Sequence, residues 1–257
     1  MSTERNTGRG RDLTARSVLL SVLLGTDPPR LPVSLLVRTT ELFGIAEGTT
    51  RTALSRMSAA GEVRATDGDY EITAPALLAR QARQSASRAG RTDEWSGSWR
   101  LAVVDAAGPR PAADRARLRG VLVGARLAEL REGVWMRPDN LGSPPAVDDV
   151  AWFAATPGGD PAELVGRLWD LDGWARRAVD LRERMGALVG ALERGDAGAL
   201  APGFVLSAAV LRHFQADPLL PRRLTPAEWP GAAFRADYDR YDGAYRDLLR
   251  DWFTSQA

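Results

Sequence analysis

Residues 44–73 read GIAEGTTRTALSRMSAAGEVRATDGDYEIT, a helical pattern followed by a hairpin pattern. We expect a helix over residues 47–60, ended by Gly61, because glycine is the preferred residue just beyond a helix. Two short β-like runs follow, and the dipeptide Asp67-Gly68 separates them. Asp-Gly favours the two-residue turn that joins antiparallel strands. This stretch therefore predicts one helix and one β-hairpin.

Two more helices are predicted before this stretch. Apolar residues share one helix face from Thr14 onward, until Gly25 and two prolines end the pattern. A second helix is expected over residues 32–43, since proline is favoured in a first turn and glycine after a helix end. Three helices and a hairpin in this order are typical of a winged helix-turn-helix. A further amphipathic helix is expected over residues 75–89.

The helix at 47–60 carries two different faces. The face expected to pack on the first two helices holds Thr50, Ala53, Leu54 and Met57. The opposite face is small and hydroxylated and is flanked by arginines, which suits entry into the major groove of DNA, since arginine can bind guanine with two hydrogen bonds. The predicted DNA-binding residues are Thr49, Arg51, Thr52, Ser55, Arg56 and, in the hairpin, Arg64. The alternative is an ordinary solvent-facing helix.

Charge is unevenly distributed along the 257 residues. Residues 1–91 hold 13 Arg against 9 Asp and Glu, whereas the whole chain holds 34 basic and 33 acidic residues. A basic first third favours nucleic-acid contact at that end, although a solvated surface with scattered charges explains the same numbers. The lack of cysteine excludes disulfides, and a single histidine argues against histidine-based metal sites. No apolar run approaches the ~20 residues that span a bilayer, so we expect a soluble cytoplasmic protein.

Four segments are expected along the chain. Residues 1–11 read as a flexible basic arm, and residues 12–90 as a winged-helix DNA-binding domain with its linker helix. Residues 91–172 follow a strand–helix–strand–strand pattern and then a further strand and helix, the order of a ferredoxin-like domain. Residues 173–257 read as an all-α domain. The predicted fold class is therefore α+β with several domains.

Two separated motifs resemble the PaaX-type transcriptional repressors, the family named for the phenylacetate degradation regulator. The first motif is carried by Gly44, Ile45, Glu47, Arg51, Ala53, Leu54, Ser55, Arg56, Met57, Gly61 and Tyr70. The second, D-P-x-L-P followed by W-P-G, is carried by Asp217, Pro218, Leu220, Pro221, Trp229, Pro230 and Gly231. The resemblance spans nearly the whole chain. It implies a dimeric repressor with a winged helix, a ferredoxin-like (Cas2-like) middle domain and a helical C-terminal domain, and an acyl-coenzyme A effector that releases DNA.

Two features depart from the family pattern. Ala46 stands where the family commonly has a helix-capping serine, and the loss of such a cap costs typically about 1 kcal/mol. The hairpin is short and carries Asp67 and Asp69 beside its tip, where we expect them to repel phosphate. The hairpin should then contribute less to DNA binding than the helix, and operator preference is expected to differ from that of closer family matches.

Three other groups of residues have candidate roles. Arg176, Arg177 and Trp152 are predicted effector-binding residues, because guanidinium groups can hold phosphates and an aromatic ring can line an apolar pocket. Solvated arginines and a packing tryptophan are the alternative. Asp105 ends a predicted strand where Cas2-type nucleases carry an aspartate, although a lone carboxylate is more often a loop cap. His213 is expected to be packed or hydrogen-bonded.

The sequence as a whole predicts a sequence-specific, DNA-binding transcriptional regulator. We expect a ligand-responsive repressor of a catabolic operon, phenylacetate-type or related, that binds a double-stranded DNA operator as a homodimer. It is expected to have no enzymatic activity, cofactor, metal or membrane partner, and its candidate effector is a small molecule or an acyl-coenzyme A. Two alternatives stay open, a Cas2-like metal-dependent nuclease that uses Asp105 and a winged-helix scaffold that binds protein.

Overall fold

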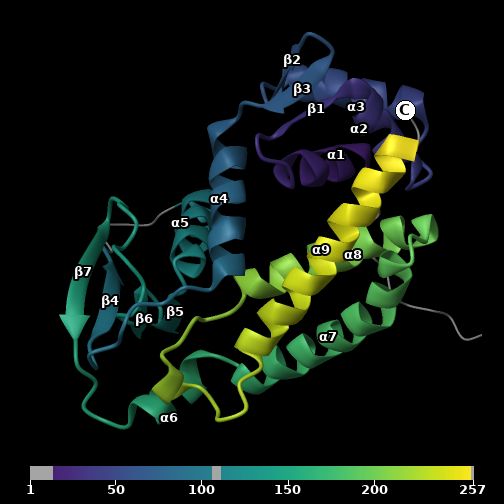
Figure 1. Ribbon diagram of the computed structural model, residues 1–257. Helices are drawn as coiled ribbons and strands as arrows, with labels where there is room; N and C mark the ends of the chain where they lie inside the picture. Colours follow the sequence, from purple (N-terminus) through teal and green to yellow (C-terminus); the bar gives the residue numbers. More distant parts are fainter. Residues whose placement is uncertain (1–13, 106–110, 256–257) are drawn as a thin grey trace, which may run out of the picture. The chain divides into compact units, whose positions relative to one another are not determined.

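A computed structural model describes residues 14–105 and 111–255 as an α+β protein with two small antiparallel sheets and a helical C-terminal region (Figure 1). Its contacts divide the chain into two compact units. Unit 1 comprises Met1–Ser85, Ala191–Ala208 and Tyr245–Ala257, and unit 2 comprises Ala86–Gly190 and Ala209–Ala244. The segment 173–257 thus contributes to both units, and the domain boundaries expected from the sequence stay a prediction. The expected arm at 1–11 lies outside the described residues.

Unit 1 begins with the helices and the hairpin that the sequence predicts. Its N-terminal elements are α1 (Ala15–Leu24), β1 (Arg30–Pro32), α2 (Val33–Glu41), α3 (Glu47–Ala59), β2 (Val63–Thr66) and β3 (Asp69–Ile72). Thr14 caps α1, because its Oγ1 accepts a hydrogen bond from the backbone N–H of Ser17 at 3.1 Å. At the hairpin tip Asp67 and Gly68 both have positive φ, 51° and 86°, as a type I′ turn requires. The three helices and the Asp-Gly hairpin are therefore confirmed.

The strand β1 is not predicted by the sequence. It pairs antiparallel with β3 and produces a three-stranded sheet in the order β1-β3-β2. The Arg30 Nε also donates a hydrogen bond to the carboxylate of Asp69, 39 residues further along the chain, at 2.7 Å. The hydrogen bonds and the ion pair that hold β1 come from this distant strand, so no local pattern could reveal it.

An apolar core fills the space between the helices and the sheet of unit 1. It contains Leu19, Leu20, Leu23, Leu24, Leu36, Leu54, Met57, Val63 and Ile72. Burial of one such side chain stabilises the fold by roughly 1.5–3 kcal/mol. Phe43, just after α2, also meets Phe204 edge to face, with ring centroids 5.0 Å apart. This contact anchors part of the C-terminal region against the end of α2 within unit 1.

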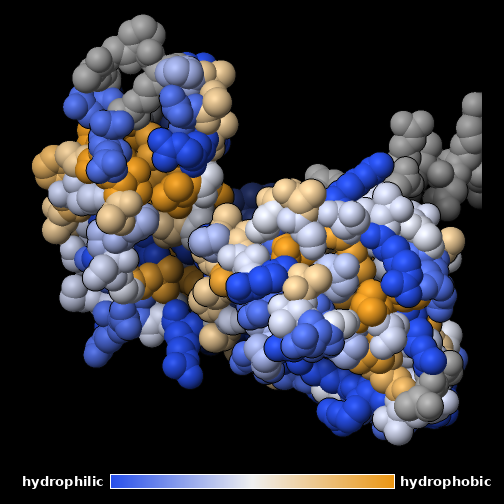
Figure 2. All heavy atoms as spheres, turned by 90° about the horizontal axis from the view of Figure 1, so that it is seen from above, coloured by the Kyte–Doolittle hydropathy of each residue, from blue (hydrophilic) through white to orange (hydrophobic). Residues whose placement is uncertain are grey.

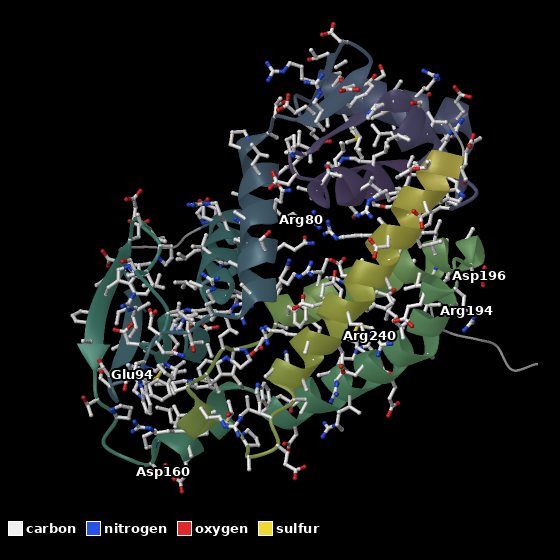
Figure 3. All side chains as sticks on the ribbon, in the orientation of Figure 1. Arg80, Glu94, Asp160, Arg194, Asp196 and Arg240 are labelled. Carbon is white, nitrogen blue, oxygen red and sulfur yellow. The ribbon has the colours of Figure 1, made fainter. Side chains whose placement is uncertain are left out.

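Unit 2 contains a four-stranded sheet. Its elements are β4 (Trp99–Val104), α5 (Ala112–Gly124), β5 (Ala128–Arg131), β6 (Val134–Pro138), β7 (Val150–Ala155) and α6 (Pro161–Leu168). The strand order is β5-β6-β4-β7, and all neighbours are antiparallel. Successive side chains point to opposite faces, so Trp99 and Met136 join one apolar cluster while Ala102 and Trp135 join another. Asp160 caps α6 by accepting the Ala162 N–H at 2.9 Å (Figure 3).

Four longer helices complete the described chain. They are α4 (Pro75–Ala89), α7 (Leu171–Glu193), α8 (Leu200–Gln215) and α9 (Gly231–Ser255), with 3-10 turns at Ala197–Ala199 and Arg222–Leu224. Each of the four helices has residues in both units. Asp196 starts the first 3-10 turn, its carboxylate accepting the Gly198 N–H at 2.8 Å (Figure 3).

The sequence predicts no apolar run that approaches membrane-spanning length, but the stretch Ala197–Gln215 does reach that length. In the part of the chain that the structure describes, this one helix is long and apolar enough to cross a membrane by length and composition alone. That is weak evidence for a membrane span, because core helices of soluble proteins pass the same test. Its residue Phe214 is fully buried and lies against Phe234, with ring centroids 4.7 Å apart. Of its apolar side chains, Leu200, Leu206, Val210 and Phe214 are buried in the packing of the protein, whereas Val205 is exposed.

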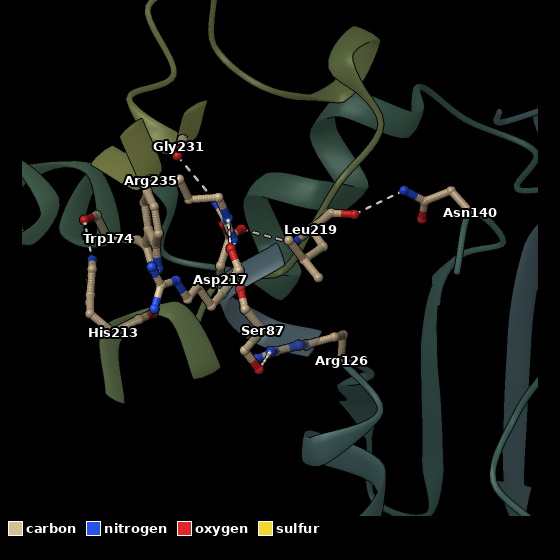
Figure 4. Close-up of polar contacts among 10 residues, drawn as sticks. Ser87, Arg126, Asn140, Trp174, His213, Asp217, Leu219, Gly231 and Arg235 are labelled. Atoms are coloured by element: carbon tan, nitrogen blue, oxygen red, sulfur yellow. Dashed lines mark hydrogen bonds and ion pairs between the residues drawn. The ribbon is translucent and has the colours of Figure 1, made fainter. Parts of the chain in front are cut away.

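A buried ion pair organises the D-P-x-L-P motif in unit 2 (Figure 4). A carboxylate oxygen of Asp217 lies 2.9 Å from an Arg235 terminal nitrogen, and the two side chains are only 2% and 15% exposed. The other carboxylate oxygen accepts the Leu219 N–H at 2.9 Å, and Arg235 also donates to three backbone carbonyl groups. Buried charges are tolerated when they are paired and hydrogen-bonded in this way. The motif therefore holds together segments that are distant in the sequence.

The single histidine is also part of the packing of unit 2. The His213 ring stacks on Trp174 with centroids 4.5 Å apart, and its Nε2 lies 3.0 Å from the Trp174 carbonyl oxygen (Figure 4). Burial lowers the pKa of His213 below its ordinary value, and the nearby Arg177 acts in the same direction. The expectation of a packed, hydrogen-bonded histidine is confirmed.

This histidine should make the protein less stable as the pH decreases. The unfolded chain takes up the proton first as the pH falls through about 6.5, so the free energy of unfolding decreases from there down to the lowered folded-state pKa. His213→Phe keeps the ring but removes the titration. We expect denaturant unfolding of this variant to show a smaller loss of stability between about pH 7.5 and about pH 5.5. The control Trp229→Phe, which alters a ring stacked on the same Trp174, should keep the full loss; equal losses in all three proteins would contradict the assignment.

Candidate nucleic-acid interface

The helix α3 separates its buried and exposed side chains as the sequence predicts. Thr50 and Leu54 are fully buried and Met57 is 2% exposed. The predicted DNA-binding residues are all exposed: Thr49, Arg51, Thr52, Ser55 and Arg56 on α3, and Arg64 on β2. Seen from above, the surface carries blue hydrophilic residues beside orange hydrophobic areas (Figure 2). The buried face fixes the helix, and the opposite face stays available for a partner.

The start of α3 lacks a side-chain cap. Ala46 occupies the N-cap with extended backbone angles, φ −64° and ψ 146°, and no side chain there bonds to the first turn. Gly44 before it has φ +70°, a conformation that glycine adopts without a steric penalty. Glu47 lies in the first turn, where its negative charge interacts favourably with the positive end of the helix dipole. The expected loss of the capping oxygen is thus confirmed, and neither Glu47 nor Thr49 replaces it.

A buried hydroxyl pair joins α2 to α3. The Oγ1 atoms of Thr40 and Thr50 are 2.6 Å apart, and both residues are fully buried. Thr40 Oγ1 also lies 2.7 Å from the carbonyl oxygen of Val37, and Thr50 Oγ1 lies 3.4 Å from that of Ala46. Buried hydroxyls need partners, so this pair constrains the position of α3 relative to α2 beyond what apolar contact alone requires.

The arginines of this surface differ in their electrostatic pairing. Arg51 Nε lies 2.7 Å from the Glu47 carboxylate, a pair one helical turn apart. Within residues 14–105 and 111–255, neither Arg56 nor Arg64 has an ion pair or a side-chain hydrogen bond. Unpaired guanidinium groups on an exposed surface attract phosphate and can bind it with two hydrogen bonds.

The hairpin is less repulsive to phosphate than the sequence suggests. The Asp69 carboxylate is occupied by Arg30, which lies on the neighbouring strand β1 at 2.7 Å. The pair neutralises one of the two acids beside the tip and leaves Asp67 in the turn. The expectation of two repelling carboxylates is therefore wrong for Asp69, because the strand that carries its partner was not predicted.

A groove of about 630 Å³ lies between the start of α1 and the exposed side of α3. It is lined by Thr14, Ala15, Arg16, Gly48, Thr49, Thr52, Ala53, Arg56, Met57, Ala60 and Glu62. At one end Arg16 and Glu62 form a forked ion pair, in which Arg16 Nε lies 3.0 Å from one carboxylate oxygen and a terminal nitrogen contacts the other. The hydrogen bonds from Arg16 to Glu62 raise the pKa of Arg16. No local pattern in the sequence indicates this pair, whose members are 46 residues apart.

The predicted effector residues are not joined by contacts. Arg176 and Arg177 are exposed on α7, and Arg177 pairs with Asp180 at 2.6 Å. Trp152 on β7 packs instead against the apolar cluster that contains Trp135. No hydrogen bond or ring contact links Trp152 to either arginine among the residues that the structure describes.

Asp105 directly follows β4. Its backbone N–H donates to the Asp149 carbonyl oxygen at 2.9 Å. In the described ranges no group of three or more His, Cys, Asp or Glu side chains could hold a metal ion. Among the described residues, Asp105 is therefore not part of a cluster of three or more such ligands.

Comparisons with known proteins found one family model and a similar solved structure. A family model described as PaaX-like protein matches residues 14–75, the segment of α1–α3 and the hairpin. No curated protein matches the chain. A solved structure, the uncharacterized protein Rv0674 from Mycobacterium tuberculosis, is 41% identical and superposes with a TM-score of 0.68, covering 93% of this chain and 98% of that one.

The matched segment belongs to transcriptional regulators, which supports a regulatory role for this protein. The chain belongs to the PaaX-like family.

The uncapped start of α3 gives a stability prediction. In Ala46→Ser a hydroxyl would accept a hydrogen bond from the first turn and stabilise the helix by about 1 kcal/mol. Amide hydrogen exchange in α3 should then slow by about fivefold. Ala59→Ser, at the exposed far end of the same helix, adds the same hydroxyl where no N–H is free to cap and should bring no gain. Equal effects of the two changes would contradict the capping argument.

The hydroxyl pair predicts coupling between α2 and α3. Thr40→Val and Thr50→Val keep the side-chain shape but break the 2.6 Å contact, and each should lower the free energy of unfolding by about 1 kcal/mol or more. The double variant should lose less than the sum, because the second change no longer breaks an intact pair. Denaturant unfolding measures all three. Thr52→Val, whose exposed hydroxyl bonds only within α3, serves as the control, and strictly additive losses would overturn the coupling.

Proposed function

We propose that this protein is a sequence-specific DNA-binding regulator, a ligand-responsive repressor that recognises double-stranded DNA through α3. The observation that carries the proposal is the division of α3 into a buried face and an exposed face of hydroxyl and guanidinium groups. Small side chains allow close approach to base edges, and Arg51 and Arg56 can read guanine or bind phosphate. Thr49, Thr52 and Ser55 supply the hydroxyls on the same face, and Arg64 on β2 adds a phosphate contact.

The proposed DNA-binding domain is a winged helix-turn-helix. The order of three helices and a hairpin supports it, as does the short sheet in which β1 closes the hairpin against the helices. The second helix of such a motif crosses the DNA backbone and the third enters the major groove. The pairing of Arg30 with Asp69 favours participation of the hairpin, since it removes one negative charge from the tip.

The proposed middle domain is ferredoxin-like. The strand order β5-β6-β4-β7 supports it, because β4, α5 and β5 form a split strand–helix–strand unit with β6 between the two strands. One feature departs from the full pattern. The helix expected before the last strand is replaced by a connection without helix or strand, and α6 follows β7 instead.

Regulation by a ligand is the remaining part of the proposal. A homodimer would read two half-sites about one helical turn (~34 Å) apart. An effector, with an acyl-coenzyme A as the candidate from the family resemblance, would release DNA by binding another dimer geometry more tightly. Arg176, Arg177 and Trp152 stay candidates for holding it, supported by the exposure of the two arginines. The proposed role on DNA supports a cytoplasmic location.

The double variant Arg56→Ala/Arg64→Ala tests DNA recognition. Duplexes selected from a random pool by the parent protein serve as probes, and fluorescence anisotropy gives affinity at several salt concentrations. We expect the affinity to fall by about tenfold or more and the salt slope to decrease by about one for each phosphate that the variant no longer neutralises. Both side chains are exposed, so the fold should be unaffected.

The matched control is Arg167→Ala/Arg194→Ala. It makes the same charge change at two exposed arginines that also lack an ion pair in the described part of the chain. This control should bind nearly as the parent does. Equal losses in both double variants, or a parent protein that selects no duplex at all, would overturn the proposed function.

A further inference from the structure

The groove between α1 and α3 extends the candidate interface to a residue outside the helix-turn-helix motif. One of its walls is formed by Thr49, Thr52 and Arg56, which belong to the exposed face of α3, and the opposite wall is the start of α1. A duplex seated on α3 therefore reaches the groove as well. The residue that α1 places there with a positive charge is Arg16.

The surroundings of Arg16 suit a phosphate group. The first turn of α1 contains no acidic residue, so the positive end of the helix dipole is not offset there. The unpaired guanidinium of Arg56 lines the same groove. Alanines and Met57 make up much of the remaining lining, which leaves room for a sugar–phosphate backbone without burying other charges.

Glu62 holds Arg16 in the geometry that a phosphate would use. The carboxylate accepts from Nε and from a terminal nitrogen of the guanidinium, a forked arrangement that phosphate oxygens adopt equally well. The Arg16 side chain is 55% exposed and the Glu62 side chain 20%. An exposed pair of this kind contributes little to stability, so an incoming phosphate can replace the carboxylate.

From these contacts we infer that Arg16 binds a phosphate of the DNA backbone in the α1–α3 groove, and that Glu62 is its intramolecular competitor. The inference rests on the proposed DNA-binding function. Glu62 neutralises Arg16 in the free protein and weakens its attraction to any duplex. Only DNA that is also well placed on α3 then displaces the carboxylate, so the pair reduces non-specific binding.

A double-mutant cycle of Arg16 and Glu62, made in the whole chain, tests the inference. Arg16→Ala should weaken binding to the duplexes that the parent protein selects and lower the salt slope by about one, and a mixed-sequence duplex of about three helical turns serves as the non-specific probe. Glu62→Gln should strengthen binding to that duplex by about threefold, the size of an exposed ion pair. In the Arg16→Ala background, Glu62→Gln should gain clearly less, because the competitor no longer has a group to release.

The exposed pair Arg250–Asp247, 3.0 Å apart on α9 and outside the groove lining, provides matched controls. Arg250→Ala and Asp247→Asn make the same charge changes and should alter affinity much less. An unchanged affinity and slope in Arg16→Ala, with the Arg56→Ala/Arg64→Ala variant still impaired, would overturn the phosphate contact while the proposed function stands. An equal gain from Glu62→Gln with and without Arg16 would overturn the competition. A parent protein without DNA affinity would instead remove the proposed function itself.

Discussion

The burial of one face of α3 is the constraint on which the rest of the candidate interface depends. Leu54 and Met57 enter the apolar core of unit 1, and Thr50 is fixed to Thr40 by a 2.6 Å contact between hydroxyl oxygens. Apolar burial supplies most of the stabilisation, but it is not directional. The hydroxyl pair adds direction, because a rotation or a slide of the helix would break the contact between these two buried oxygens and leave each with only a backbone carbonyl group as partner. The exposed face of the helix is thereby set as firmly as its buried face.

The arginines on that surface differ in whether a carboxylate neutralises them. Arg51 and Arg16 are each held by a carboxylate of the same unit, whereas Arg56 and Arg64 are unpaired in the described residues. Exposed ion pairs are weak and sensitive to salt. A surface that mixes paired and unpaired guanidinium groups can therefore attract a polyanion without the strong non-specific affinity that four unpaired charges would bring.

Unit 2 depends on a different kind of interaction. The Asp217–Arg235 pair is almost completely buried, and it joins the loop after α8 to α9. Arg137, also buried, forms no ion pair with a carboxylate among the described residues; it donates to backbone carbonyls and to Asn140, and burial lowers its pKa to about 10. Removing one partner of a buried network leaves the other charge uncompensated. This unit is thus specified by polar contacts between distant segments as much as by its apolar clusters.

The sequence by itself determined the helices, the Asp67-Gly68 turn and the side of α3 that faces solvent, because periodicity and turn chemistry are local properties. It also determined the missing cap at Ala46. Only the tertiary structure decided the strand β1, the Arg30–Asp69 pair that neutralises part of the hairpin, and the Arg16–Glu62 pair beside α3. Each of these joins residues roughly forty or more positions apart, and such contacts form only after the chain has overcome the loop-closure entropy that opposes bringing their segments together. No local pattern records which distant segments will meet.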